Sequence, residues 1–176
     1  MNLNPTHIRQ FVVILICVTA AAIIASVTIG RDIYYGTTQV SFLSFGIINF
    51  SGYLFFLFMP VELAFIYYLH TGLSMVFLNL IAVSTSILSL MIDYYIGRSF
   101  STKFIDLLVG RHRYEKAENR IRQYGNISIF LFNLLPLASP VILLAAGMLK
   151  HPMKQALLYS LLGLVAKYLF MTIVFF

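Results

Sequence analysis

Long apolar runs separated by short polar segments make up most of the chain. The first run covers residues 10–30 and is bounded by Arg9 and Arg31. A membrane-spanning helix needs about 20 mainly apolar residues, whereas the core of a signal peptide has about 7–15. The pattern therefore predicts a retained N-terminal spanning helix over residues 8–30.

The second run, residues 40–91, contains Glu62 as its only formal charge. Pro60 interrupts it, because proline cannot donate the helical hydrogen bond and pushes the preceding residue away from helical geometry. Broken backbone at membrane depth is tolerated only inside protein or around water. The sequence leaves open whether residues 40–78 form a re-entrant hairpin or a full crossing. The later part of the run predicts a spanning helix over residues 72–96.

A third apolar segment, residues 126–149, is uncharged and is broken by Pro136 and Pro140. Its arms of about ten residues span only about 15 Å as helix, half of a hydrocarbon core of about 30 Å. It could cross once as a kinked helix or return to the same side as a hairpin. Both flanks are basic and both therefore favour the cytoplasmic side, so we favour the hairpin. The last run, residues 155–176, predicts a final spanning helix.

The two halves of the chain follow a similar order. Each has a Pro-broken segment, then a glycine (Gly72 or Gly147), then a spanning helix. Two hairpins that enter from opposite sides would form an inverted repeat of the kind found in secondary transporters, whose sites lie near the midplane. We therefore expect an all-α integral membrane protein with one transmembrane domain, residues 1–176. It would have about three spanning helices, two opposed hairpins and a basic interfacial helix.

Composition supports a lipid environment, because 60% of the residues are apolar and only 10% are charged. A soluble domain usually has about 25% charged residues. The charges gather in residues 101–125, where a basic interfacial helix is expected, divided at Gly110 and capped by Gly125. Such a cluster favours a cytoplasmic position for residues 99–125 and for the N-terminus of a multi-pass protein of the cell membrane.

No motif for zinc, a nucleotide phosphate or RNA is present, and the single Cys17 cannot form an internal disulfide. We therefore predict no cofactor, no metal and no nucleic-acid partner. The expected partners are membrane lipids, and a homo-oligomer stays open.

Glu62 and Lys167 are the strongest candidates for a functional site. A charged side chain within an apolar segment is costly and usually faces a cavity on a substrate or proton path. For Glu62 the alternative is an interfacial carboxylate that only ends a helix. Lys167 lies near the middle of the last run. It is expected to face protein, either a carboxylate or hairpin carbonyls, unless its helix begins late and places it near the surface.

Four further residues are weaker candidates for the same path. Asp93, about one turn before Arg98, could pair with it near the cytoplasmic boundary, and Arg98 could equally be a membrane anchor. Asn133 and Ser139 could line a polar cavity together with carbonyls freed by the prolines, or could satisfy the backbone of their own hairpin. His70 is more often structural at such a place than a proton relay.

Several motifs in this order resemble the DedA family, also called VTT or SNARE-associated membrane proteins, in its short prokaryotic branch. They are Pro60-Val61-Glu62, then the segment from Asp93 to Gly97-Arg98, then Glu115 to Glu118 and Tyr124-Gly125, and finally residues 130–140 followed by Ala145-Ala146-Gly147. The resemblance covers residues 59–154, within a core of about residues 40–154. Relatives commonly carry arginines about where this chain has Asn133 and Ser139, which leaves Lys167 as the candidate replacement cation.

The resemblance implies opposed re-entrant hairpins and a role in lipid transport. Bacterial relatives are linked to recycling of undecaprenyl phosphate and to proton-dependent membrane homeostasis, and eukaryotic relatives are scramblases. We therefore expect a transporter or lipid scramblase, with Glu62 as the candidate for proton coupling. The alternatives are a scaffold that binds anionic lipids or a partner through the basic helix, and an intramembrane enzyme. The last is disfavoured because no metalloprotease or nucleophile-elbow motif is present.

Overall fold

The computed structural model of the chain describes residues 40–54, 61–99, 111–135 and 139–176, with a few isolated positions between residues 20 and 35. These ranges are helical, and two helices, α4 (Met75–Ser99) and α9 (Met153–Phe175), are long and apolar enough to cross a membrane. Both agree within three residues with the predicted spanning segments. The expected N-terminal helix over residues 8–30, the breaks at Pro60 and Pro136, and residues 101–110 lie outside the described residues.

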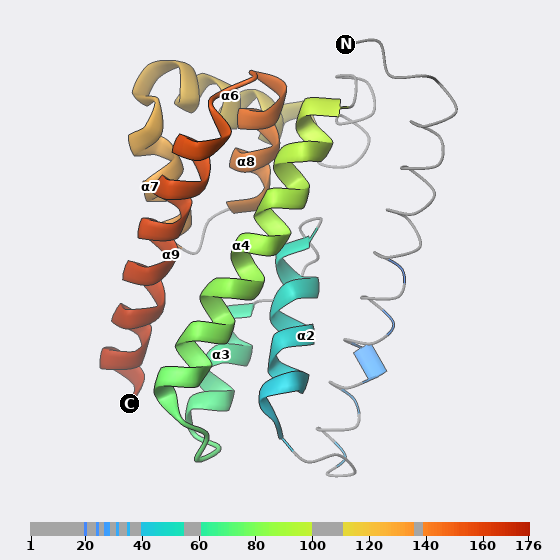
Figure 1. The fold of residues 1–176 in the computed structure, drawn as a ribbon, viewed down its shortest axis with the longest axis vertical. Coiled ribbons are helices and arrows are strands. Elements are labelled where there is room, and N and C mark those ends of the chain that lie inside the picture. The colour runs from blue at the N-terminus through green and yellow to red at the C-terminus, as the bar shows by residue number, and fades with distance from the viewer. Residues whose placement is uncertain are drawn as a thin grey trace.

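Four shorter helices form two pairs. The first pair is α2 (Phe42–Tyr53) and α3 (Val61–Leu69), and the second is α7 (Asn126–Leu134) and α8 (Ser139–Met148). The first pair lies at the end of the molecule where α4 begins, and the second lies at the opposite end, where α9 begins (Figure 1). Each arm has only 9–12 residues, or about 14–18 Å of helix, so no arm crosses a bilayer alone.

The two halves share one packing scheme. In each half the first arm packs on the long helix of its own half, so that α2 contacts α4 and α7 contacts α9. The second arm packs on the long helix of the other half, so that α3 contacts α9 and α8 contacts α4. The long helices also contact each other. Each half therefore contributes one arm to the packing of the other.

Local sequence accounts for several helix ends. Ser41 and Ser44 form a capping box that begins α2. Gly72, with a positive φ of 79°, forms the turn between α3 and α4. Gly125, also with a positive φ, ends α6 (Arg111–Tyr124), as expected, and its N–H donates to the carbonyl of Ile121 at 2.8 Å. The turn before α9 is different, because Lys150 has the positive φ there.

Gly147 lies inside α8 at a helix crossing, whereas Gly72 forms a turn. A Cβ atom on Gly147 would overlap the carbonyl of Tyr94 on α4, and one on Gly97 would overlap the carbonyl of Leu144 on α8. The two glycines thus let α4 and α8 meet backbone to backbone, as small residues do in membrane helix pairs.

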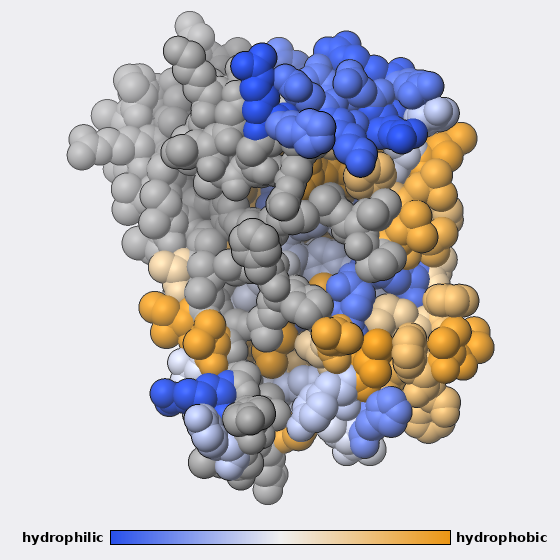
Figure 2. All heavy atoms as spheres, turned by 180° about the vertical axis from the view of Figure 1, so that it is seen from behind, coloured by the Kyte–Doolittle hydropathy of each residue, from blue (hydrophilic) through white to orange (hydrophobic). Residues whose placement is uncertain are grey.

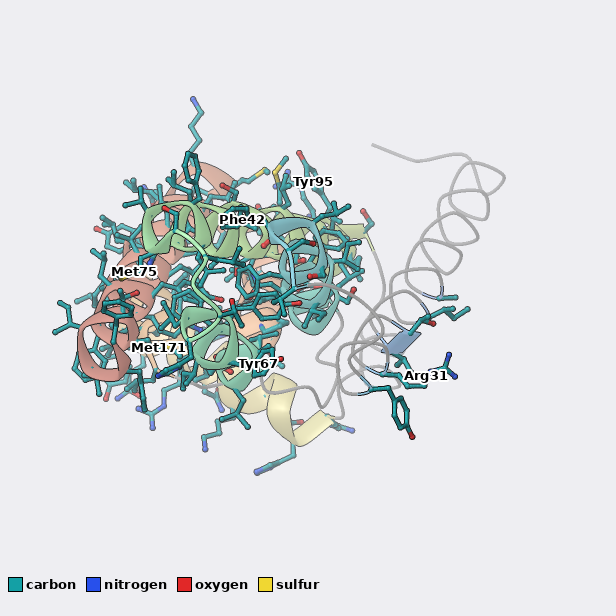
Figure 3. The ribbon with its side chains drawn as sticks, turned by 90° about the horizontal axis from the view of Figure 1, so that it is seen from below. Arg31, Phe42, Tyr67, Met75, Tyr95 and Met171 are labelled. Atoms are coloured by element: carbon teal, nitrogen blue, oxygen red, sulfur yellow. The ribbon has the colours of Figure 1, made fainter. Side chains whose placement is uncertain are left out.

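The apolar core of the bundle also encloses several polar side chains, and many large apolar side chains lie on its outside. The buried polar residues include Asn49, Ser86, Asp93, Asn133 and Lys167. The exposed face of α4 is apolar, and so is that of α9; their large exposed residues include Val76, Phe77, Leu80, Leu88, Leu162, Leu169, Phe170 and Ile173. The view from below shows the end of the bundle where α2, α3, α4 and α9 lie together, with one residue labelled on each: Phe42, Tyr67, Met75 and Met171 (Figure 3). This arrangement suits lipid as the surrounding solvent.

Charged and polar residues gather at the opposite end, over α6 (Figure 2). Helix α6 exposes most of its basic residues and buries Ala117 and Ile121, and it packs on α8 and α7. Two of its arginines pair with carboxylates one turn away, Arg111 with Glu115 and Arg122 with Glu118, both at 2.8 Å. The basic helix therefore lies at the end where α7 begins and α8 ends.

Candidate functional site

A buried ion pair joins the last long helix to the first helix pair. Lys167 on α9 is only 4% exposed, and its Nζ donates to Oε1 of Glu62, at the start of α3, at 3.0 Å. About a quarter of the Glu62 side chain is exposed. The structure thus places Lys167 against a carboxylate, one of the two environments expected for it. The carboxylate is the more accessible partner, and the ammonium is the enclosed one.

Two tyrosines complete the surroundings of the Lys167 ammonium. Nζ also donates to the hydroxyl of Tyr53, the last residue of α2. The ring centres of Tyr53 and Tyr168 lie 5.0 and 5.3 Å from Nζ, within the range in which an aromatic face attracts a cation. The ammonium is therefore held by α2 and α9 themselves as well as by Glu62.

A chain of hydrogen bonds continues from this cation to α4. The Tyr168 hydroxyl donates to Oδ1 of Asn49 at 2.9 Å. Nδ2 of Asn49 then lies within bonding distance of three acceptors on α4, namely the Ala82 carbonyl at 3.0 Å, Thr85 Oγ1 at 2.8 Å and Ser86 Oγ at 3.0 Å. Buried polar groups that are fully paired in this way fix one arrangement of the helices. Helices α2, α4 and α9 are thus joined by side chains.

Asn133 and Ser139 belong to a second set of contacts, in the other helix pair. Asn133 is the eighth residue of α7, as Asn49 is the eighth residue of α2. Its Nδ2 donates to the Ile129 carbonyl at 2.8 Å and to Ser160 Oγ on α9 at 3.2 Å. Ser139 Oγ donates to the Phe132 carbonyl at 3.0 Å, which joins the start of α8 to α7. Ser139 thus bonds within its own helix pair, whereas Asn133 also joins α7 to α9.

The remaining candidates lie along α4 and at the end of α3. Asp93 is buried, at 1% exposed. Arg98 donates from Nη1 to the Tyr94 hydroxyl at 3.1 Å, and the suggested pair between Asp93 and Arg98 stays a prediction. Five residues at about 100° each place the two side chains about 140° apart around the helix. Exposed His70 contacts the Ile66 carbonyl through Nδ1 at 2.9 Å, which is the expected structural role.

The arrangement can respond to charge. A carboxylate that takes up a proton loses its attraction for the ammonium, and an incoming anion can compete for the same ammonium. Either event removes a polar contact between α3 and α9, and the bonds from Asn49 to α4 do not involve Glu62. Among the residues that the structure describes, no group of three or more His, Cys, Asp or Glu side chains is placed to hold a metal ion.

Comparison with known proteins identifies the family. A family model described as the VTT domain matches residues 56–175. The match begins just before Glu62 and includes Lys167, so both partners of the buried ion pair lie within it. No curated protein and no solved structure matches the chain.

Proposed function

This chain belongs to the VTT-domain family of integral membrane proteins, also called the DedA or SNARE-associated family, and we propose that it moves a lipid or a small solute across the bilayer. In this proposal it acts as a transporter or scramblase, and its partners are membrane lipids. The observation that supports it best is the buried pair between Lys167 and Glu62. Ionisable groups inside a membrane bundle usually mark the path of a substrate or proton.

The short helices provide the reason for a path at this place. We take α2 with α3, and α7 with α8, as re-entrant hairpins that enter from opposite faces. Because each arm reaches only about halfway through a hydrocarbon core of about 30 Å, the barrier to a polar group is thinnest where the hairpins end. Glu62 begins the second arm of one hairpin, and Ser139 begins the second arm of the other. A headgroup or solute would therefore meet polar side chains there.

In this proposal, movement along the path depends on whether Glu62 is ionised. In its ionised form it holds α3 against α9 through Lys167, and on protonation it gives up this contact. This makes Glu62 the proton-responsive group of the proposed transporter, with Lys167 as its fixed partner. Asn133 and Ser139 would line the other side of the path. Asp93 and Arg98 would lie further along α4, toward the cytoplasmic face.

Reconstitution into liposomes that contain fluorescent lipids tests this function. The wild-type protein is expected to move a labelled lipid between leaflets, and Glu62→Gln is expected to slow that movement at least tenfold, about 1.4 kcal/mol in the barrier. Glu115→Gln is the matched control, because Glu115 is a half-exposed carboxylate on α6 and also pairs with a basic residue. Unchanged movement with Glu62→Gln would contradict the role of Glu62. Failure to move any lipid or solute would contradict transport.

The second candidate function is a scaffold that binds anionic headgroups or a partner through α6. The supporting observation is the exposed basic face of α6, where Lys116 and Arg120 lie beside the two paired arginines. Neutralising Arg111, Arg113, Arg120 and Arg122 together tests this reading. If that variant lost function while Glu62→Gln kept it, the scaffold would be the better account.

A further inference from the structure

The two hairpins are held in the bundle to very different degrees, although their packing schemes correspond. Helix α8 buries nine of its ten residues, whereas α3 buries four of its nine. Helix α8 also meets α4 backbone to backbone at Gly97 and Gly147. Helix α3 contacts α9 and α4 through far fewer residues. The second arm of one hairpin is therefore fixed along its length, and that of the other is not.

The first arm of the second hairpin is also held closely. A Cβ atom on Gly163 of α9 would lie 2.6 Å from the Phe130 carbonyl of α7, so the two helices touch through backbone there as well. Close-packed helices of this kind cannot shift gradually, because any displacement creates overlaps or voids. The second hairpin thus forms a rigid unit with α4 and α9.

The two ends of α3 differ in how they are attached. At its C-terminal end the Tyr68 hydroxyl lies 2.7 Å from Ser44 Oγ, and its ring packs on Phe45, with ring centres 5.1 Å apart. Both partners belong to α2. At its N-terminal end the polar attachment to the other described residues is the bond from Lys167 to Glu62. Between them, the Phe65 ring packs against Tyr168 at 4.8 Å, a contact without a directional bond.

The partners of Lys167 also differ in how they are attached to the rest of the bundle. Tyr53 and Tyr168, which surround the ammonium, belong to α2 and α9, and these helices are tied to α4 through Asn49. The ammonium therefore keeps its place when Glu62 leaves. In this pair the cation belongs to the fixed part of the molecule, and the carboxylate belongs to the part with few attachments.

From this asymmetry we infer that α3 is the moving arm of the protein. It pivots at its Tyr68 end, and the contact of Glu62 with Lys167 is the latch that closes it. Tyr53 is a positioning residue that keeps the ammonium in place while the latch is open. The second hairpin, α7 and α8, does not move relative to α4. This inference identifies the mobile element of the proposed transporter. Its biological role rests on the proposed function, whereas its structural basis does not.

Distances between pairs of spin labels in the full-length protein, with Cys17 replaced by alanine, test the inference. One label is placed at Leu88 on α4, and the second at Leu63, Tyr67 or Leu131, all of which are exposed. The Leu63 pair reports on the latched end of α3, the Tyr67 pair on its pivot end, and the Leu131 pair on the second hairpin. In Glu62→Gln, a second, longer distance is expected for the Leu63 pair. It should be absent from the Tyr67 pair and from the Leu131 pair.

Three further variants separate the latch from a general loss of structure. Restoring the contact with the charges exchanged, Glu62→Lys with Lys167→Glu, should return the Leu63 pair to its single distance. Ser44→Ala, which removes a bond at the pivot, should leave the Leu63 pair unchanged. If Glu62→Gln does not fold, Glu62→Asp shortens the latch by one methylene and should give the same second distance.

Two results would overturn the inference. One is an unchanged Leu63 distance in a folded Glu62→Gln protein, and the other is an equal change in the Leu131 pair. Because the distances are measured without a substrate, either result leaves the transport proposal to its own assay. Conversely, an absence of lipid movement does not test the latch, which only the measured distances test.

Discussion

Lys167 is the most enclosed basic side chain that the structure describes, and its charge is compensated by a partner from another helix. Removing one member of a fully buried ion pair typically costs about 3–5 kcal/mol, because the other charge remains without compensation. Glu62 is partly exposed, so we expect Glu62→Gln to cost less, about 2 kcal/mol of unfolding free energy. Thermal unfolding of the purified protein in detergent measures this loss as a lower midpoint.

The double variant Glu62→Gln with Lys167→Met separates the cost of an unpaired charge from the value of the pair. Because it removes the buried charge together with its partner, it should recover most of the stability lost in Glu62→Gln. A double variant less stable than Glu62→Gln would contradict this account. It would mean that the Lys167 ammonium stabilises the bundle through Tyr53 and Tyr168 alone.

His151 gives a prediction about pH at the polar end of the molecule. It lies between α8 and α9, where its Nε2 is 2.6 Å from Oδ1 of Asn126, and partial burial lowers its pKa below the ordinary value of 6.5. The unfolded chain therefore binds a proton more readily than the folded one. Stability from this residue is complete above pH 6.5 and falls as the pH drops toward the lowered pKa.

Unfolding midpoints between pH 7.5 and 5 should thus fall less in His151→Gln than in the wild type, because glutamine keeps a polar partner for Asn126 without titrating. His70→Gln is the control. His70 is exposed in the turn that follows α3, and it contacts the Ile66 carbonyl of α3. A wild-type pH profile in His151→Gln would contradict the assignment.

At the site, the sequence made the charged residues predictable and the neutral ones not. A single Glu or Lys in a long apolar run has few tolerable environments, so Glu62 and Lys167 could be identified and an interior partner for Lys167 expected. Tyr53, Tyr168 and Asn49 were missed. Tyrosine is common at membrane interfaces without any site, and Asn49 was visible only as an interruption of an apolar run. Their importance depends on which helices meet, and that is a property of the fold.

At the scale of elements, the crossing of α4 and α8 depends on two glycines. Gly97→Ala would place a Cβ against the Leu144 carbonyl, and Gly147→Ala would place one against the Tyr94 carbonyl. Backbone cannot move aside as a flexible side chain can, so the helices must separate. We expect each variant to lose about 3 kcal/mol or more, at the upper end of typical overpacking costs. The measurement is the unfolding midpoint together with the yield of monodisperse protein.

Gly46→Ala is the matched control for this crossing. Gly46 is also a helical glycine, in α2, but a Cβ there would lie 3.4 Å from a methyl group of Ile81, an ordinary contact. Alanine is a better helix former than glycine by about 1 kcal/mol, so this variant should be neutral or slightly more stable. If Gly97→Ala and Gly46→Ala changed the unfolding midpoint equally, close backbone contact would not be the role of Gly97.

The positions of the two long helices were predictable because the length of an apolar run determines them, whereas Pro140, expected at a break, is the second residue of α8. The expected spanning segments 72–96 and 155–176 correspond to α4 and α9, and Gly125 ends α6 as expected. The role of Gly147 was not predictable. A glycine near a helix end looks the same in sequence whether it forms a turn or allows a close crossing, and only the neighbouring helix distinguishes the two.

At the scale of the molecule, the two pairs of short helices lie at opposite ends of a bundle that is apolar outside and encloses several polar side chains in its apolar core. The basic residues of α6, and with them Lys150 and Lys154, lie at the end where α9 begins. Positive charge favours the cytoplasmic side, so we propose that this end, together with the N-terminus and residues 99–125, is cytoplasmic. The turn between α3 and α4 would then face the other side of the membrane.

Cysteine accessibility in sealed vesicles of both orientations tests this topology, in a protein with Cys17 replaced by alanine. Single cysteines at Gln123 and Lys154 stand on either side of the second hairpin, and one at His70 follows the first; all three positions are exposed. A membrane-impermeant maleimide should label Gln123→Cys and Lys154→Cys from the cytoplasmic face only, and His70→Cys from the opposite face only. Labelling of Gln123→Cys and Lys154→Cys from opposite faces would mean that α7 and α8 cross the bilayer as one kinked helix. The path between two half-depth hairpins would then lose its structural basis.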